Sequence, residues 1–238
     1  MPRAVAFETR RSSLTAWRAV EAQHLVSTAS LVDTLAEQQI LESLLESSKP
    51  RIPAQSKHLH WLLFTPFRYA PPPGGSRFRG RHDPGVLYAA DEIRTACAEL
   101  GYWRWRHLLD SPALTAMPQR PQTVFQIGLR GSTIDLREPP FVRQRRKWTD
   151  PQDYFATQRL ANRARAQQIE LIRYESVRDP QHAGCVAVLD AVAFGHPAPL
   201  AQETWLLHVT RERATWVRSN PLRLERYEFV AATDWPWR

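Results

Sequence analysis

Cysteine is scarce in this sequence, since the chain of 238 residues contains only Cys97 and Cys185. The two are far apart, form no CxxC pair and have no cluster of cysteine and histidine around them. Neither a disulfide framework nor a zinc site is therefore indicated. The eight histidines include no HExxH pattern and no pair at the helical i,i+4 spacing, so we expect no metal.

Long hydrophobic runs are also missing. No stretch approaches the roughly 20 apolar residues that a helix needs to span a bilayer. Residues 1–7 lead directly into Glu8, Arg10 and Arg11, without the apolar segment or the cleavage site of a secretory signal. Together with the scarce cysteines, this pattern predicts a cytoplasmic protein that contacts no membrane.

Glycine is sparse, with nine residues against 19 prolines, which favours stiff connections over flexible linkers. With 43% hydrophobic residues and nine tryptophans, a chain of this length can bury a sizeable core. The formal net charge is +8, which indicates an anionic partner: nucleic acid, a dinucleotide or an acidic protein. Charge alone does not choose among the three.

Residues 12–48 carry apolar residues at spacings near three and four, which predicts two helical segments. These apolar residues are Leu14, Trp17, Leu31, Leu35, Leu41, Leu44 and Leu45. Lys49-Pro50 ends the second segment, because the residue before a proline is pushed out of the helical region. We therefore expect residues 1–50 to form an N-terminal helical extension and residues 51–238 to form the main domain.

The main domain shows short segments rich in β-formers, with helices early and between them. Strands are expected over 86–89, 123–129, 133–136, 169–175, 185–189, 203–209, 215–218 and 225–230, and helices over 91–106 and after 149. Because there is no regular βαβ rhythm, the pattern indicates an α+β fold and not a Rossmann fold. On the helix 91–106, Glu99 lies beside the apolar stripe, which predicts a half-buried carboxylate at the edge of a cleft.

Arginines are dense in the segment 68–81, where a proline- and glycine-rich stretch predicts an irregular loop. The planar fork of arginine suits bidentate contact with phosphate oxygens, so a pyrophosphate would fit there. A solvated basic loop would have the same composition. A Walker-type phosphate site is excluded, because the segment lacks the Gly-Lys-Ser/Thr ending.

A second basic region supports a different class of function, a nucleic-acid-binding module without catalysis. Arg143-Gln144-Arg145-Arg146-Lys147-Trp148 is followed by Arg159, Arg163 and Arg165. Basic side chains beside a tryptophan are what phosphate contact and base stacking require. A solvated basic stretch with Trp148 packed inward is the alternative interpretation.

Several short blocks, taken in order, resemble the RES domain, the toxin component of Xre–RES toxin–antitoxin modules. The blocks are Phe67-Arg68-Tyr69, Ser76-Arg77-Phe78, Gly85–Ala90 with Thr95-Ala96 and Glu99, Tyr174–Asp179, Cys185–Leu189 and Ala193-Phe194. The resemblance covers roughly residues 57–195. It rests on order and spacing and not on one continuous motif.

This resemblance implies an ADP-ribosyltransferase-like fold, with a mixed β-sheet core and flanking helices, and an enzyme that consumes NAD. The expected reaction is cleavage of the nicotinamide–ribose bond, either as an NAD glycohydrolase or phosphorylase or as a protein ADP-ribosyltransferase, without a metal. Mapped by the resemblance, the catalytic residues are Glu99, Ser176 and Arg68, and the NAD-binding residues are Arg68, Tyr69, Arg77 and Tyr88.

The chain departs from the family in the loop that commonly reads Gly-x-Arg-Trp-Asn, which here is Gly75-Ser76-Arg77-Phe78-Arg79. Residues 1–50 have no counterpart in the minimal domain, so they are expected to cover the domain, to form a homo-oligomer interface or to bind the antitoxin. The family implies an acidic Xre-family antitoxin as partner, whose segment would block the Arg68/Arg77 cleft. Nucleic acid would then be reached only through that antitoxin.

Overall fold

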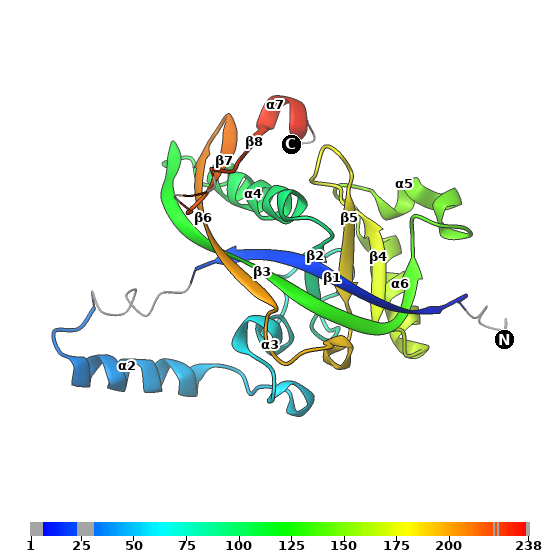
Figure 1. The fold of residues 1–238 in the computed structure, drawn as a ribbon, viewed down its shortest axis with the longest axis horizontal. Helices are drawn as coiled ribbons and strands as arrows, with labels where there is room; N and C mark the ends of the chain where they lie inside the picture. The colour runs from blue at the N-terminus through cyan, green and yellow to red at the C-terminus, as the bar shows by residue number, and fades with distance from the viewer. Residues whose placement is uncertain (1–6, 23–30, 221, 223, 237–238) are drawn as a thin grey trace.

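The computed structural model describes residues 7–22, 31–220, 222 and 224–236. An eight-stranded mixed sheet lies at the centre of these residues, in the order β1-β2-β5-β4-β3-β6-β7-β8 (Figure 1). The strands are β1 (Arg10–Glu21), β2 (Leu87–Ala90), β3 (Ala116–Asp135), β4 (Leu171–Glu175), β5 (Gly184–Val188), β6 (Ala201–Thr210), β7 (Arg213–Arg218) and β8 (Arg226–Val230). The predicted α+β fold, with a mixed sheet and flanking helices, is confirmed.

The helices lie around this sheet and between its strands. They are α2 (Leu35–Ser48), α3 (Trp61–Arg68), α4 (Ile93–Leu109), α5 (Arg145–Trp148), α6 (Phe155–Ala166) and α7 (Ala231–Asp234), with short 3₁₀ turns η1 (Ala54–Ser56), η2 (Phe141–Gln144) and η3 (Ala191–Ala193). No helix within the described ranges is long and apolar enough to cross a membrane.

The prediction of a helix in the first part of residues 12–48 is wrong, because residues 10–21 form the strand β1. This strand pairs antiparallel with β3 along its whole length, from Arg10 opposite Thr133 to Glu21 opposite Gln122. Both of its faces are covered: Leu14 and Ala16 pack on one core, and Trp17 and Ala19 on the other. A strand that is apolar on both sides places residues such as Leu14 and Trp17 three apart, which imitates the period of a helix.

The second part of the prediction is confirmed, since α2 is a helix. Thr34 caps it in a reciprocal capping box: its side chain accepts a hydrogen bond from the Glu37 backbone N–H, and the Glu37 carboxylate accepts one from the Thr34 N–H. The helix lies apart from the sheet at the lower left of Figure 1, and none of its described side chains is buried. The division of the chain at residue 50 stays a prediction; residues 1–6 and 23–30 lie outside the described part of that segment.

β3 organises the sheet because it has several neighbours. The two strands expected over 123–129 and 133–136 are one continuous strand of 20 residues. It pairs antiparallel with β1 and β6 and parallel with the start of β4. β1 in turn meets β2 at one pair, Trp17 opposite Ala90, so that β1, β2, β5, β4 and β3 form a closed ring of strands.

Two hydrophobic cores flank these strands. The larger one contains α4, α6 and the tryptophans Trp105, Trp205, Trp216 and Trp235, and the smaller one contains the apolar side of α3 with Leu62 and Leu63. In Figure 1, α4 and α3 accordingly lie on opposite sides of the β1–β3 pair. The candidate site lies on the side of α4.

Candidate active site

A cavity of about 340 Å³ opens between α4, β1, β2 and the loop that precedes β2. This volume is in the range of small-molecule sites, which are mostly apolar and contain a few converging polar groups. Its lining residues are Trp17, Arg18, Ala19, Pro72, Gly75, Ser76, Arg77, Tyr88, Ala89, Ala90, Ala96, Glu99, Leu100, Trp103, Tyr154, Tyr174, Val177, Arg178 and Cys185. Three arginines and one carboxylate are therefore set among aromatic and small apolar side chains.

Glu99 lies on the second turn of α4 and is partly buried at the cavity wall. Its Oε1 accepts a hydrogen bond of 2.6 Å from the Ser176 hydroxyl, which follows the end of β4. The Ser176 oxygen itself accepts from the backbone N–H groups of Arg178 (3.2 Å) and Asp179 (2.9 Å). Since both acceptor positions of the hydroxyl are occupied, its single proton is directed to the Glu99 carboxylate.

Arg18 enters the cavity from β1. Its Nη1 donates a hydrogen bond of 2.6 Å to the carbonyl of Tyr88, while its Nε is buried and has no partner among the described residues. Burial lowers the pKa of Arg18 to about 10. As a cationic side chain in the cavity lining, Arg18 is suited to an anionic ligand there.

Arg77 is held by the loop before β2. Its Nη1 donates to the carbonyl of Trp148 (2.9 Å), and its guanidinium lies 4.8 Å from the centre of the Tyr154 ring. Gly75 has φ +72° there, and a Cβ would lie 2.2 Å from the Arg79 carbonyl oxygen, so the turn requires glycine.

Tyr88 supports the same loop from β2. Its hydroxyl bonds to the Ser76 hydroxyl (2.7 Å) and accepts from the Phe78 N–H (3.0 Å), and burial raises its pKa. Phe78, which replaces the family's tryptophan, is fully buried between the rings of Tyr88 and Tyr174. The altered loop thus has a packed aromatic anchor.

Arg178 is the third arginine of the cavity, and it is buried. Its Nη2 donates to the Pro151 carbonyl (2.6 Å) and the Tyr154 hydroxyl (3.2 Å), whereas its Nη1 has no partner among the described residues. The guanidinium lies 3.9 Å from the centre of the Tyr102 ring. Trp103, at 50% exposure, lies at the rim beside it.

The structure brings together four of the six residues that the sequence analysis selected. Arg77, Tyr88 and Glu99 line the cavity, and Ser176 is bonded to Glu99. Arg68 and Tyr69 do not line it.

Arg68 lies at the end of α3 and is engaged elsewhere. Its Nη2 pairs with Glu46 of α2 at 2.7 Å, and its Nε donates to the Pro50 carbonyl at 2.5 Å. Tyr69 is exposed, and its carbonyl accepts from Arg79. Their predicted role in binding NAD is therefore without support from this cavity and stays a prediction.

Sequence reasoning missed Arg18, Tyr154 and Trp103, and it included Arg178 only as part of the block Tyr174–Asp179, without a role. Arg18 was hidden because its strand imitated a helix. The period-two sequence around it could have revealed the strand, with Leu14, Ala16 and Val20 on one side and Trp17 and Ala19 on the other. That alternation does not by itself assign Arg18 to the cavity.

The second basic region is folded against the domain. Trp148 is buried and its indole N–H donates to the Phe141 carbonyl, so its ring is not available to stack on a base. Arg145 pairs with Glu175, and Arg165 donates to the Phe78 carbonyl. The inward packing of Trp148 removes the feature that most favoured a nucleic-acid-binding module.

A family model described as RES domain matches residues 50–210. No curated protein matches. Among solved structures, a chain of the M. tuberculosis MbcT–MbcA toxin–antitoxin complex is similar, with a TM-score of 0.47 and 11% identity over 94% of this chain and 88% of that chain. Arg18 lies before the matched segment.

Proposed function

This chain belongs to the RES domain family, and on that premise we propose that it is an enzyme that breaks the nicotinamide–ribose bond of NAD. One observation carries the proposal: a carboxylate, Glu99, is oriented by a committed hydrogen bond from Ser176 in a cavity lined by three arginines. The family resemblance of the sequence supplies the substrate, and the arrangement of charges is suited to it.

The chemistry of NAD explains why this arrangement is suited. When the bond breaks, its electron pair goes to the nicotinamide nitrogen, which neutralises the ring, and C1′ of the ribose gains positive charge. A carboxylate held close to C1′ stabilises that charge in a site with few waters. Glu99 has this role in our proposal, and an oxygen nucleophile then bonds to C1′.

The arginines have a different role, because the pyrophosphate is charged before and after the reaction. Arg18 and Arg77 would hold it, and each charge-assisted hydrogen bond contributes about 1.5–3 kcal/mol. Arg178 also lines the cavity, so its positive charge would add to the attraction for the anion. The rings of Tyr154 and Trp103 offer surfaces on which the bases of NAD can stack.

Ser176 positions the carboxylate and is not the nucleophile. Its proton is committed to Glu99 and its oxygen to two backbone N–H groups, so no lone pair is free to attack C1′. The nucleophile is water, inorganic phosphate or a protein side chain, and the three give ADP-ribose, a phosphorylated ADP-ribose or a modified protein. Product analysis distinguishes them.

Uncontrolled loss of NAD would be toxic to the cell that makes this enzyme. We therefore also propose, from the family resemblance and the net charge of +8, that an acidic Xre-family antitoxin binds over the cavity. Complementary charge favours such a complex.

Turnover of NAD by the purified chain tests the main proposal. Glu99→Gln keeps the size of the side chain and an oxygen that accepts from Ser176, but removes the charge. We expect kcat to fall by about 10²–10³, the order seen when one preorganised electrostatic group is lost, with little change in KM.

Glu175→Gln is the matched control. Glu175 directly precedes Ser176 but does not line the cavity, and it pairs with Arg145 instead. We expect its turnover to equal that of the wild type. If Glu99→Gln turned over NAD normally while Glu175→Gln did not, the catalytic carboxylate would be Glu175.

A further inference from the structure

Asp179 is a buried carboxylate that the proposed reaction does not use. It is 1% exposed and does not line the cavity. Its Oδ2 accepts a hydrogen bond of 2.7 Å from the Thr95 hydroxyl, and its Oδ1 accepts from the Gln181 N–H (3.1 Å) and from the guanidinium of Arg94. Burying a charge is costly unless it is paired and hydrogen-bonded, and these three partners offset the cost of burying the Asp179 carboxylate.

The contact of Asp179 with Thr95 and Arg94 joins the same two segments of the chain that carry Ser176 and Glu99. Thr95 and Arg94 belong to the first turn of α4, and Glu99 follows one turn later on the same helix. Asp179 belongs to the segment between β4 and β5 that also carries Ser176. The Asp179 carboxylate therefore ties the segment of Ser176 to the helix of Glu99.

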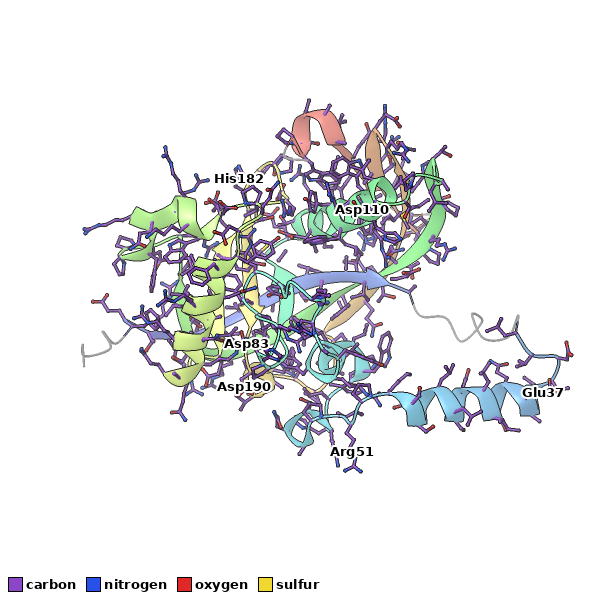
Figure 2. All side chains as sticks on the ribbon, turned by 180° about the vertical axis from the view of Figure 1, so that it is seen from behind. Glu37, Arg51, Asp83, Asp110, His182 and Asp190 are labelled. Atoms are coloured by element: carbon purple, nitrogen blue, oxygen red, sulfur yellow. The ribbon has the colours of Figure 1, made fainter. Side chains whose placement is uncertain are left out.

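The same residue also sets the direction of the Ser176 proton. Its backbone N–H, with that of Arg178, occupies the acceptor side of the Ser176 hydroxyl. The segment is tightly turned: the His182 N–H donates to the Asp179 carbonyl at 2.8 Å, and His182 has φ +53°. Figure 2 shows His182 on this segment, at the opposite end of the molecule from Glu37 of α2.

We propose that Asp179 is a positioning residue that acts through Thr95 and Ser176 to hold the Glu99 carboxylate in its reactive orientation. The inference rests on the proposed function, because it assigns a role toward the same reaction. It is independent of substrate binding, since neither Asp179 nor its partner Arg94 lines the cavity.

Substitution of Thr95 tests this more gently than removal of the buried charge. Thr95→Val keeps the shape and removes the hydroxyl that bonds to Asp179, whereas Thr95→Ser keeps the hydroxyl. A misplacement of about 1 Å at a reacting group can cost of the order of 10² in rate, so we expect kcat of Thr95→Val to fall by about tenfold or more, with KM within about twofold. Thr95→Ser should restore kcat to within about twofold of the wild type.

Asp135→Asn is the control for loss of a buried ion pair. Asp135 is 7% exposed and bonds to Arg137, but it does not line the cavity. It should lower the melting temperature without changing kcat per folded molecule. If Thr95→Val likewise lowered only the melting temperature, Asp179 would be a structural residue and the proposal would be overturned.

Hydrogen exchange separates this proposal from the proposed function. The amide protons of Arg178 and Asp179 should exchange faster in Thr95→Val than in the wild type and Thr95→Ser, whatever the enzyme does to NAD. Unchanged exchange at both amides would refute the positioning role. A wild type that leaves NAD intact, with the exchange difference present, would refute the reaction and leave the Asp179 contact as the element that orients Ser176.

Discussion

Replacement of Arg18 by alanine tests most directly whether the cavity, and not the sequence resemblance, identifies the arginine that binds NAD. The sequence resemblance selects Arg68 and Arg77 as the arginines that bind NAD. Of these, only Arg77 lines the cavity, and Arg18 lines it in place of Arg68. Loss of one charge-assisted contact with the pyrophosphate is worth about 1.5–3 kcal/mol. Because each 1.4 kcal/mol is a factor of ten, NAD should bind about 10–150 times more weakly to Arg18→Ala.

The effect on folding should be smaller than the effect on binding. Arg18→Ala leaves the Tyr88 carbonyl without the 2.6 Å hydrogen bond, but it also removes a buried guanidinium whose Nε has no described partner. The pairing of β1 with β3 is made by the backbone and is kept. Arg18→Lys keeps the charge but not the planar fork, so its affinity for NAD should lie between those of the wild type and Arg18→Ala.

Arg68→Ala is the matched comparison. It breaks the ion pair with Glu46 and the hydrogen bond to the Pro50 carbonyl, and both of these contacts lie outside the cavity. Calorimetric titration of NAD, in a Glu99→Gln background that consumes the ligand slowly, measures both affinities. Weak binding in Arg68→Ala together with unchanged binding in Arg18→Ala would refute the assignment.

Two further predictions concern the N-terminal segment and the partner. Deletion of residues 1–50 should abolish cooperative thermal unfolding and NAD turnover, because it removes β1 with Arg18. Replacing residues 31–49 by a short polar linker should leave both properties nearly unchanged. Equal melting curves for the two variants would contradict this prediction. The complex with the acidic antitoxin should weaken as salt is raised, since screening reduces the attraction between opposite charges, and an affinity that does not depend on salt in a titration would argue against the electrostatic contact.

The position of Glu99 could be predicted from the sequence because it depends on local periodicity. A carboxylate beside the apolar stripe of a helix must lie at the edge of the surface that the helix buries, and Glu99 does lie partly buried at the cavity wall. The late strands could be predicted for the same reason, since their period of two is written in a few adjacent residues.

The arginine that enters the cavity could not be chosen in this way. Arg18 and Arg68 each adjoin an aromatic residue and carry the same charge, so the local sequence does not distinguish them. What distinguishes them is that β1 pairs with β3, more than a hundred residues later in the chain, whereas Arg68 meets Glu46 at the end of α3.

The hydrogen bond between Ser176 and Glu99 joins positions 77 residues apart, and the contact of Asp179 with Thr95 spans 84. Composition, periodicity and spacing therefore determined the fold class and the half-buried carboxylate, and they predict an anionic partner. Only the tertiary structure decided which arginines line the same cavity as that carboxylate and which way the Ser176 proton points, because long-range strand pairing and the packing of α4 bring together groups that local sequence cannot relate.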